Sequence, residues 1–98
     1  MSDRTTPNGR IITAHALISL LRHGFQDPFY LVDDIIENYS RRTTQDDGST
    51  VYIQRAAGRR RRYNIVIEGE EGIVTGLLNL TARELQNLGQ NYGFDSNL

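Results

Sequence analysis

Three polar side chains recur at helical spacing near the start of the chain, within residues 10–25. His15, Ser19 and Arg22 follow the spacing i, i+4, i+7, which places them along one side of a helix. An imidazole has an unperturbed pKa near physiological pH, so His15 is the candidate for proton transfer. The alternative is that His15 is a surface histidine with no chemical role.

A second histidine and a cluster of arginines extend the possible chemistry. His23 lies about 80° around the helix from His15, where it either complements the helix dipole or acts as a second acid or base. Guanidinium groups bind phosphate in a planar, bidentate manner and can stabilise negative charge that develops during reaction. The alternative for the cluster is a solvated loop with surface ion pairs. The clustered residues are Arg59, Arg60, Arg61 and Arg62.

Two residues of predicted strands and one of the tail complete the candidate site. Tyr63 and Thr75 fall in strand centres on the predicted inner face. A tyrosine there is commonly a core residue, whereas an inward threonine needs a hydrogen-bond partner. Tyr92, in the closing motif NYGF, can stack on a nucleobase or cover the edge of the core.

Length and composition limit the classes of protein. Ninety-eight residues suit one domain, and we assign residues 1–10 to a flexible N-terminal arm and residues 11–98 to a single α+β domain. The absence of cysteine excludes disulfides and thiolate catalysis, and two histidines argue against structural zinc, so no metal or cofactor is expected. The net charge of −1 argues mildly against a DNA-coating protein, although all 11 basic residues are arginine. No apolar run predicts a signal peptide or a membrane span.

The elements that must position these groups follow from periodicity and turn signals. His23-Gly24 ends the first helix, whose apolar face comprises Ile12, Ala16, Leu17, Leu20 and Leu21. Asp27 and Pro28 predict the N-cap and first turn of a second helix. Thr81 and Glu84 predict a capping box for a short helix near the C-terminus. Alternation and turn residues predict strands at 41–45, 49–55, 62–68 and 73–78.

Short turns between consecutive strands favour an antiparallel meander. The prediction is therefore an α+β fold in which two N-terminal helices pack on one face of a four-stranded antiparallel sheet, followed by a short C-terminal helix. In this arrangement we expect His15 and the arginine cluster to meet across one groove.

The order of these features resembles a family of small bacterial ribonuclease toxins. The matching features are His15 and Arg22 in an H-x(6)-R setting, a following Gly24-Phe25, a second helix, an alternating hairpin and the Ile-Val-Thr of residues 73–75. They are similar to the barnase–EndoU–colicin–RelE group, found at the C-termini of contact-dependent and other polymorphic toxins in bacterial competition.

The resemblance implies metal-independent cleavage of RNA, often tRNA, by attack of the ribose 2′-hydroxyl on phosphorus. It makes His15 a general acid or base and lets one or more of the clustered arginines, Arg62 included, hold the phosphate. Tyr63 and Thr75 would line the scissile site, and Arg22 and Tyr92 would contact the substrate. The missing lysines and near-neutral charge depart from the family pattern.

Such toxins act in the cytoplasm of a target cell after secretion or delivery from a cell surface, without a membrane-spanning segment of their own. The resemblance therefore also implies a cognate immunity protein that closes the cleft. Two alternatives remain: a non-catalytic immunity or antitoxin-type protein-binding module, and a structural accessory domain of a phage or secretion machine.

Overall fold

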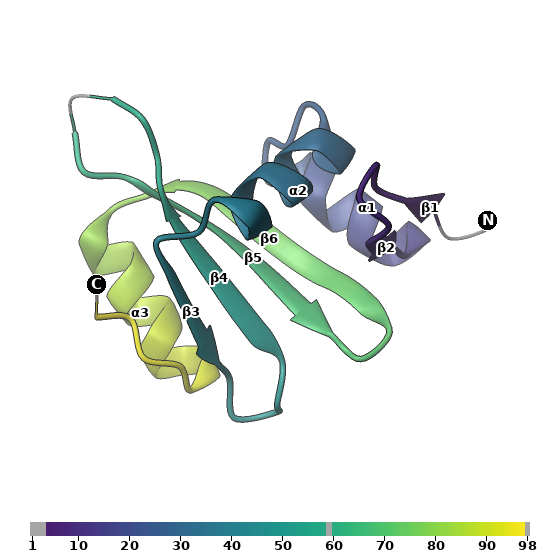
Figure 1. Ribbon diagram of the computed structural model, residues 1–98. Coiled ribbons are helices and arrows are strands. Elements are labelled where there is room, and N and C mark those ends of the chain that lie inside the picture. Colours follow the sequence, from purple (N-terminus) through teal and green to yellow (C-terminus); the bar gives the residue numbers. More distant parts are fainter. Residues whose placement is uncertain (1–3, 59, 98) are drawn as a thin grey trace.

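A computed structural model describes residues 4–58 and 60–97 of the chain. Within them, a six-stranded sheet has the strand order β1-β2-β6-β5-β4-β3 and is accompanied by three helices (Figure 1). The elements are β1 (Arg4–Thr5), β2 (Ile11–Ile12), α1 (Ala14–Arg22), α2 (Pro28–Glu37), β3 (Arg41–Thr44), β4 (Thr50–Arg55), β5 (Tyr63–Gly69), β6 (Gly72–Leu80) and α3 (Ala82–Tyr92).

The predicted four-stranded antiparallel sheet is wrong, because the sheet has six strands and is mixed. The strands β3 to β6 pair antiparallel, but β2 joins β6 in parallel through the pair Ile12↔Ile73. In turn, β1 pairs antiparallel with β2. Both additional strands come from the N-terminal part of the chain, where two-residue strands leave no alternating pattern to detect.

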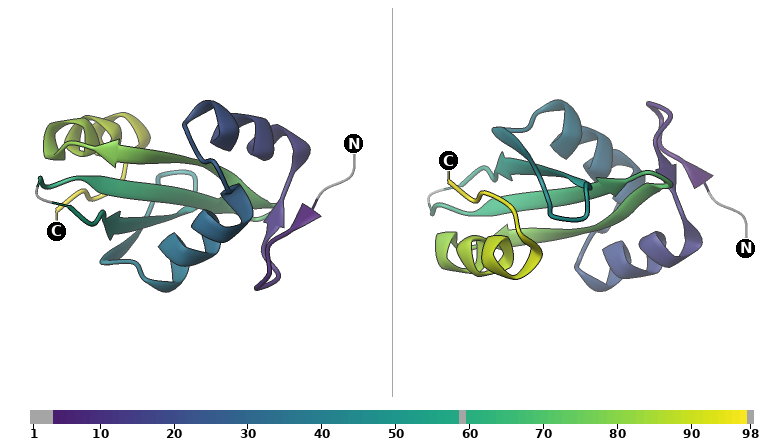
Figure 2. Two further views of the ribbon diagram at one scale, coloured as in Figure 1. Left: turned by 90° about the horizontal axis from the view of Figure 1, so that it is seen from above. Right: turned by 90° about the horizontal axis from the view of Figure 1, so that it is seen from below.

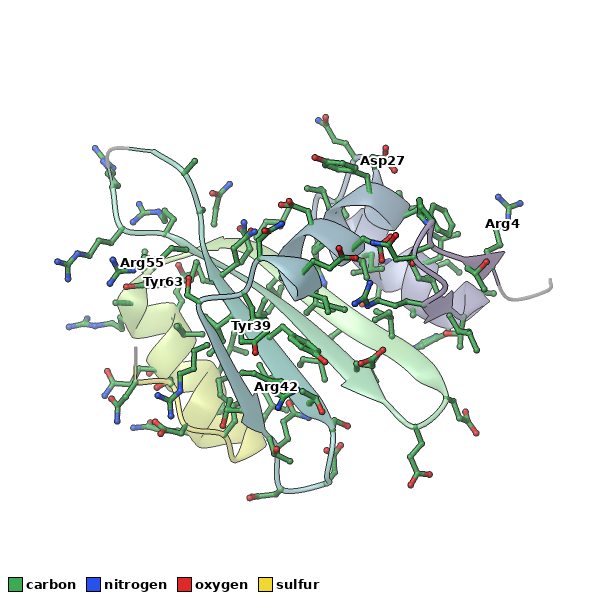
Figure 3. The ribbon with its side chains drawn as sticks, viewed as in Figure 1. Arg4, Asp27, Tyr39, Arg42, Arg55 and Tyr63 are labelled. Atoms are coloured by element: carbon green, nitrogen blue, oxygen red, sulfur yellow. The ribbon has the colours of Figure 1, made fainter. Side chains whose placement is uncertain are left out.

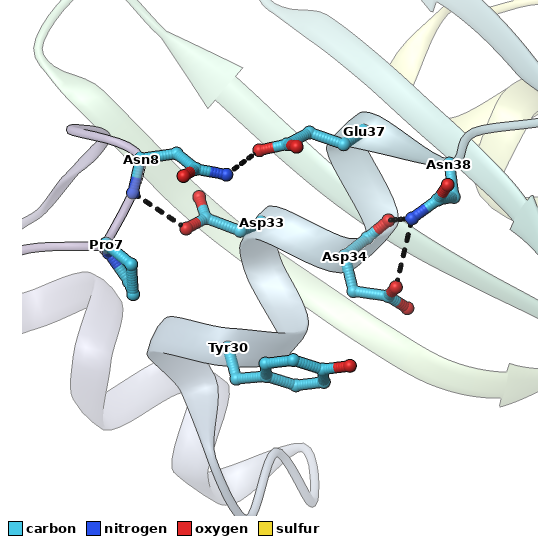
Figure 4. Close-up of a pocket in the computed structure, with 7 residues that line it drawn as sticks. All are labelled: Pro7, Asn8, Tyr30, Asp33, Asp34, Glu37 and Asn38. Atoms are coloured by element: carbon cyan, nitrogen blue, oxygen red, sulfur yellow. Dashed lines mark hydrogen bonds between the residues drawn. The ribbon is translucent and has the colours of Figure 1, made fainter.

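The described part of the segment predicted as a flexible arm is attached to α2. The carboxylate of Asp33 accepts hydrogen bonds from the backbone N–H of Asn8 at 3.0 Å and from Nη1 of Arg10 at 2.9 Å. Arg10 also contacts Glu37 at 3.1 Å, and Asn8 donates to the same Glu37 (Figure 4). These contacts connect the chain on either side of the turn between β1 and β2 to the second helix.

The charge of Asp33 is stabilised by this attachment. Burial acts to raise the pKa of Asp33, but hydrogen bonds from Thr6, Arg10 and Asn8 outweigh it, and the pKa lies below its ordinary value. A carboxyl group with a depressed pKa in the folded state contributes stability above its unfolded pKa of about 3.9. That contribution is lost as the pH falls through the folded-state pKa.

We expect Asp33→Asn to lower the free energy of unfolding by about 1–3 kcal/mol at pH 7, because Arg10 and the Asn8 N–H lose a charged acceptor. The difference from the parent chain should shrink between about pH 5 and pH 2, as the parent carboxylate is protonated. Urea denaturation across this range measures both effects. Glu70→Gln, in the exposed turn between β5 and β6, is the control that should leave stability unchanged at pH 7. A difference for Asp33→Asn that persists unchanged at pH 2 would contradict the electrostatic explanation.

The helix boundaries follow from the capping residues. The Thr13 side chain accepts the N–H of Ala16 at the start of α1, and Asp27 accepts the N–H of Tyr30 ahead of Pro28 in α2. At α3 both halves of the predicted capping box are present between Thr81 and Glu84. Each cap satisfies a backbone donor that the first turn of a helix leaves free.

Helices cover both faces of the sheet, and each face has its own core. α1 and α2 contribute to one core, whereas α3 packs on the opposite face (Figure 1). In both views of Figure 2, α3 lies toward one end of the strands, near the C-terminus, and α1 and α2 lie toward the other end. The first core contains Leu20, Phe25, Val32, Ile35, Val66 and Ile73 among its buried residues. The second contains Val51, Ile53, Ile65, Ile67, Leu85 and Phe94. The central strand β5, in which Ile65, Val66 and Ile67 are all buried, is therefore covered on both sides, unlike a strand of a sheet with helices on one face alone.

Candidate functional site

The strongest constellation of reactive side chains lies where the C-terminal half of α1 meets β6. The Oγ of Ser19 and the Oγ1 of Thr75 are 2.7 Å apart, and Thr75 Oγ1 lies 3.4 Å from Nδ1 of His23. Ser19 and His23 are four residues apart, so the helix brings both to the same side. The result is a hydrogen-bonded chain from a serine through a threonine to an imidazole.

An irregularity in β6 turns Thr75 toward this chain. Thr75 pairs with Ile67, but the next pair joins Ile73 to Glu68, which leaves Val74 as an additional residue in β6. A β-bulge of this kind reverses the alternation of side chains. Ile73 therefore belongs to the core beneath α1 and α2, whereas Leu77 packs with the core beneath α3. Strict alternation along 73–78 would place Ile73, Thr75 and Leu77 on one face, but the bulge puts Ile73 on the opposite face from Thr75 and Leu77.

The imidazole of His23 is exposed, and its interaction with Thr75 uses only one ring nitrogen, Nδ1. When Nδ1–H donates to Thr75, the Thr75 hydroxyl donates in turn to Ser19, and the lone pair of Nε2 is left available. This tautomer is the one required of a general base.

His23 and Thr75 line a cavity of about 320 Å³, called here the His23 cavity. Its walls come from α1, from the end of the β3–β4 hairpin, from β5 and β6, and from the last turns of α3. The lining is mostly apolar, with a few polar groups, which is typical of ligand sites. The lining residues are His23, Gln45, Asp47, Ile65, Ile67, Val74, Thr75, Leu77, Leu88 and Tyr92.

Two polar residues that sequence patterns did not single out belong to this cavity. Gln45 is 9% exposed, and its Nε2 donates to Oδ1 of Asp47 at 3.3 Å. Its Oε1 is buried without a hydrogen-bond partner among the described residues. The pKa of Asp47 is lowered by hydrogen bonds from the backbone and side chain of Ser49 and from Gln45. The sequence does contain an indication for Gln45. If the alternation of residues 41–45 is continued through the hairpin at Asp46-Gly48, Gln45 falls on the same face as Val51 and Ile53.

His15 lies in an adjoining cavity of about 480 Å³ beside the turn between β5 and β6, called here the His15 cavity. The two cavities share Asp47 and Val74. Glu70 and Glu71 also line the His15 cavity, so its charged groups are mostly acidic. His15 is exposed, and no side-chain hydrogen bond joins it to another described residue.

The arginine loop, residues 56–62 between β4 and β5, lies at the other end of the sheet. Successive turns of an antiparallel meander alternate between the two ends, so the loop is separated from the turn at Glu70-Glu71 by the length of β5 (Figure 1). Arg60 and Arg61 are exposed, Arg62 is half-buried, and Arg59 lies outside the described residues. His15 and the arginine cluster thus do not meet across one groove.

Tyr63 is also distant from the histidines. It begins β5 beside the arginine loop, where Figure 3 labels it next to Arg55. It is 5% exposed and lines a separate cavity with Leu85 and Gln86 of α3. Of the residues predicted as catalytic, His15 and Thr75 therefore lie at one end of the sheet, and Arg62 and Tyr63 at the other.

The remaining predicted substrate contacts lie near His23. Tyr92, the last residue of α3, lines the His23 cavity and is 53% exposed. Arg22 is the exposed last residue of α1 and directly precedes His23. Among the described residues the ion pairs join Arg10 to Asp33 and Glu37, and Arg41 to Asp95, so Arg22 and the described part of the arginine loop form none.

Within residues 4–58 and 60–97, no group of three or more histidine, aspartate or glutamate side chains is arranged to hold a metal ion. The helices in this part of the chain are too short or too polar to cross a bilayer. Comparisons of the chain with protein-family models, with curated proteins and with solved structures found no match.

Proposed function

We propose that this domain is a metal-independent endoribonuclease in which His23, held by Thr75 and Ser19, transfers the proton. The observation that supports the proposal is the hydrogen-bonded chain Ser19–Thr75–His23, of which Thr75 and His23 line a cavity. His23 takes the place first assigned to His15, because His23 has a hydroxyl partner that orients its ring and His15 does not.

The reaction is a transesterification within the RNA strand. Nε2 of His23 accepts the proton of a ribose 2′-hydroxyl as its oxygen attacks the phosphorus of the adjacent 3′-phosphate. The bond from phosphorus to the 5′-oxygen of the next nucleotide breaks, a 2′,3′-cyclic phosphate forms, and the leaving oxygen takes up a proton from solvent. Thr75 fixes the tautomer of the ring, and Ser19 accepts the hydrogen bond of Thr75.

Phosphate binding is divided between two places in this proposal. Arg22, next to His23, is the guanidinium available for the scissile phosphate. The arginine loop begins about 13 Å away along the sheet, because Thr75, the partner of His23, pairs with Ile67, four residues along β5 from Tyr63. It therefore holds phosphates other than the scissile one, which favours a longer substrate such as tRNA over a dinucleotide.

We expect the triple variant Arg60→Gln, Arg61→Gln, Arg62→Gln to bind RNA at least about tenfold more weakly at low salt. Each phosphate contact contributes about 0.7 to the slope of log affinity against log salt for a single strand, so the slope should fall by about 2. Filter binding over a salt series measures this. Arg4→Gln, an exposed arginine at the far end of the molecule (Figure 3), is the matched control. An unchanged salt slope for the triple variant would contradict RNA binding by the loop.

The activity itself is tested by incubating the purified domain with total tRNA in EDTA. Cleavage that leaves 2′,3′-cyclic phosphate ends supports the proposal, and loss of cleavage in EDTA contradicts the metal-independent mechanism. We further propose that the domain is a toxin delivered into the cytoplasm of competing cells and neutralised by an immunity protein. Strong expression without that partner should then stop growth, and His23→Ala should restore it.

A second function is favoured by the charge of the His15 cavity. Asp47, Glu70 and Glu71 would repel the RNA backbone but would attract a basic protein surface. A non-catalytic protein-binding module of the immunity or antitoxin type would use this end of the sheet for docking. Harmless expression together with capture of a basic partner through Glu70 and Glu71 would support this alternative.

A further inference from the structure

The cavity lined by Tyr63, called here the Tyr63 cavity, has a volume of about 230 Å³ and lies beside the first turns of α3. Carboxylates line the cavities that contain Asp33, His15 and His23, but none lines the Tyr63 cavity. An anion is therefore repelled least at this place. The lining residues are Tyr63, Ala82, Leu85, Gln86, Ser96 and Asn97.

The hydroxyl of Tyr63 has no hydrogen-bond partner among the described residues. The side chain is 5% exposed, and its ring belongs to the core beneath α3. The fully shielded side-chain atoms without a partner in this part of the chain are Nε of Arg41 and Oε1 of Gln45, so the Tyr63 hydroxyl keeps accessible surface. The cavity that Tyr63 lines is where a ligand can reach it. Because a buried tyrosine hydroxyl normally finds a partner, this one is available for a ligand.

The first turn of α3 supplies further donors. The capping box uses the backbone N–H groups of Thr81 and Glu84. The N–H groups of Ala82 and Arg83 have no partner within residues 4–58 and 60–97, and Ala82 lines the cavity. The N-terminus of a helix carries partial positive charge and binds anions through such groups.

Side chains beside the cavity add positive charge. Arg55 pairs with Tyr63 across β4 and β5, so the two side chains lie on the same face of the sheet (Figure 3). Arg55 is exposed and forms no ion pair with another described residue. The carboxylate of this turn, Glu84, accepts the N–H of Thr81, and its pKa is lowered by hydrogen bonds from Thr81 and by the charge of Arg62. The two guanidinium groups therefore outweigh the one carboxylate.

From these contacts we infer that the Tyr63 cavity binds one phosphate group, through the hydroxyl of Tyr63, the N–H of Ala82 and the guanidinium of Arg55. Ser96, which also lines the cavity, adds a second hydroxyl. All four groups donate hydrogen bonds to an oxyanion, and two of them carry full or partial positive charge.

This phosphate is not the scissile one. α3 extends from the Tyr63 cavity at Ala82 to the His23 cavity at Tyr92, about 15 Å along the helix axis. In an RNA strand that follows α3, the Tyr63 cavity holds a phosphate of the flanking nucleotides. The assignment to RNA rests on the proposed ribonuclease function, whereas the binding of phosphate does not.

The test is an NMR titration of the ¹⁵N-labelled domain with inorganic phosphate at constant ionic strength, with chloride as the control anion. We expect saturable shifts of the backbone amides of Tyr63, Ala82 and Arg83 with phosphate and not with chloride. Shifts that do not saturate, or that are spread evenly over the exposed arginines, would overturn the inference.

Tyr63→Phe removes the hydroxyl and keeps the ring in the core. Urea denaturation should show unchanged stability, because no hydrogen bond to a described residue is lost. Phosphate should bind at least about fivefold more weakly, since a hydrogen bond to a charged group is removed. Arg55→Gln, at an exposed position, should weaken phosphate to a similar degree. Tyr30→Phe, 62% exposed in α2 and outside the cavity, is the matched control. Unchanged phosphate binding by Tyr63→Phe would overturn the role of its hydroxyl.

An RNA phosphate and a free phosphate are distinguished with a 2′-O-methyl RNA oligonucleotide, which cannot undergo the cleavage reaction. For an RNA site we expect the oligonucleotide to shift the same amides, to bind more weakly to Tyr63→Phe and to compete with inorganic phosphate. Oligonucleotide binding that is the same for Tyr63→Phe and the parent chain would overturn the assignment to RNA. Because this assay measures binding alone, binding here without tRNA cleavage leaves the site standing while the proposed catalysis fails. Cleavage without phosphate binding gives the opposite result.

Discussion

The His23→Ala domain is expected to cleave RNA about 10²–10⁴-fold more slowly than the parent chain, which is the usual contribution of a positioned general acid or base. The side chain is exposed at the end of α1, so its removal should leave the fold intact. The rate is measured under single-turnover conditions with end-labelled tRNA in EDTA. The near-UV and far-UV circular dichroism spectra check that the variant is folded.

His15→Ala is the matched control, because both histidines are exposed residues of the same helical segment. Eight residues of helix place the two backbone positions about 12 Å apart. Only His23 contacts a hydroxyl of the described chain, so His15→Ala should change the rate by less than about threefold, far below the range for a general acid or base. A large loss in His15→Ala with an active His23→Ala would contradict the assignment and restore the first interpretation of the sequence.

Local signals in the sequence predicted local structure well. The Asp27-Pro28 start of α2 and the capping box at Thr81 each depend on contacts within one turn of the chain. The turn residues Asp46-Gly48 likewise join β3 and β4 as a hairpin. In each case the residues that determine the structure are also the ones that form it, so no knowledge of the rest of the fold is needed.

The errors in the fold come from contacts between distant parts of the chain. β2 joins the sheet through a single pair, Ile12↔Ile73, which no pattern of two residues can specify. The attachment of Arg10 to Asp33 depends on where α2 lies, and the bulge at Val74 depends on its pairing with β5. Periodicity carries no information on these three contacts.

The errors in the site have the same origin. A helical wheel separates the apolar and polar sides of the first helix, but it does not say where β6 lies. Leu21, assigned to the apolar face, is 52% exposed, whereas Ser19 of the polar stripe meets Thr75. The separation of the arginine loop from the turn at Glu70-Glu71 was predictable, since consecutive turns of a meander lie at opposite ends. The position of His15 was not predictable, because it is β2 that places α1 and His15 beside that turn.

Gly76 in β6 lets α1 lie close enough to β6 to form the candidate site. A Cβ atom at this position would lie 2.7 Å from the carbonyl oxygen of Ile65 and 2.7 Å from Cζ of Phe25. It would also lie 3.2 Å from Cδ2 of Leu20, the neighbour of Ser19 in α1. These atoms belong to backbone and to fully buried side chains, which cannot move aside without shifting the helix.

Gly76→Ala should therefore lower the free energy of unfolding by about 2–3 kcal/mol, the upper range for overpacking a well-filled core. Because the same shift moves Ser19 and His23 away from Thr75, cleavage should also slow under conditions where the variant is still folded. Urea denaturation and single-turnover cleavage at low temperature measure the two effects. Gly69→Ala, also in a strand, is the control: its Cβ would lie 3.3 Å from Cγ2 of Val74 and 3.6 Å from Oγ of Ser49, so its cost should be smaller. If Gly76→Ala were as stable as Gly69→Ala, the close contact between α1 and β6 would not be what holds His23 against Thr75.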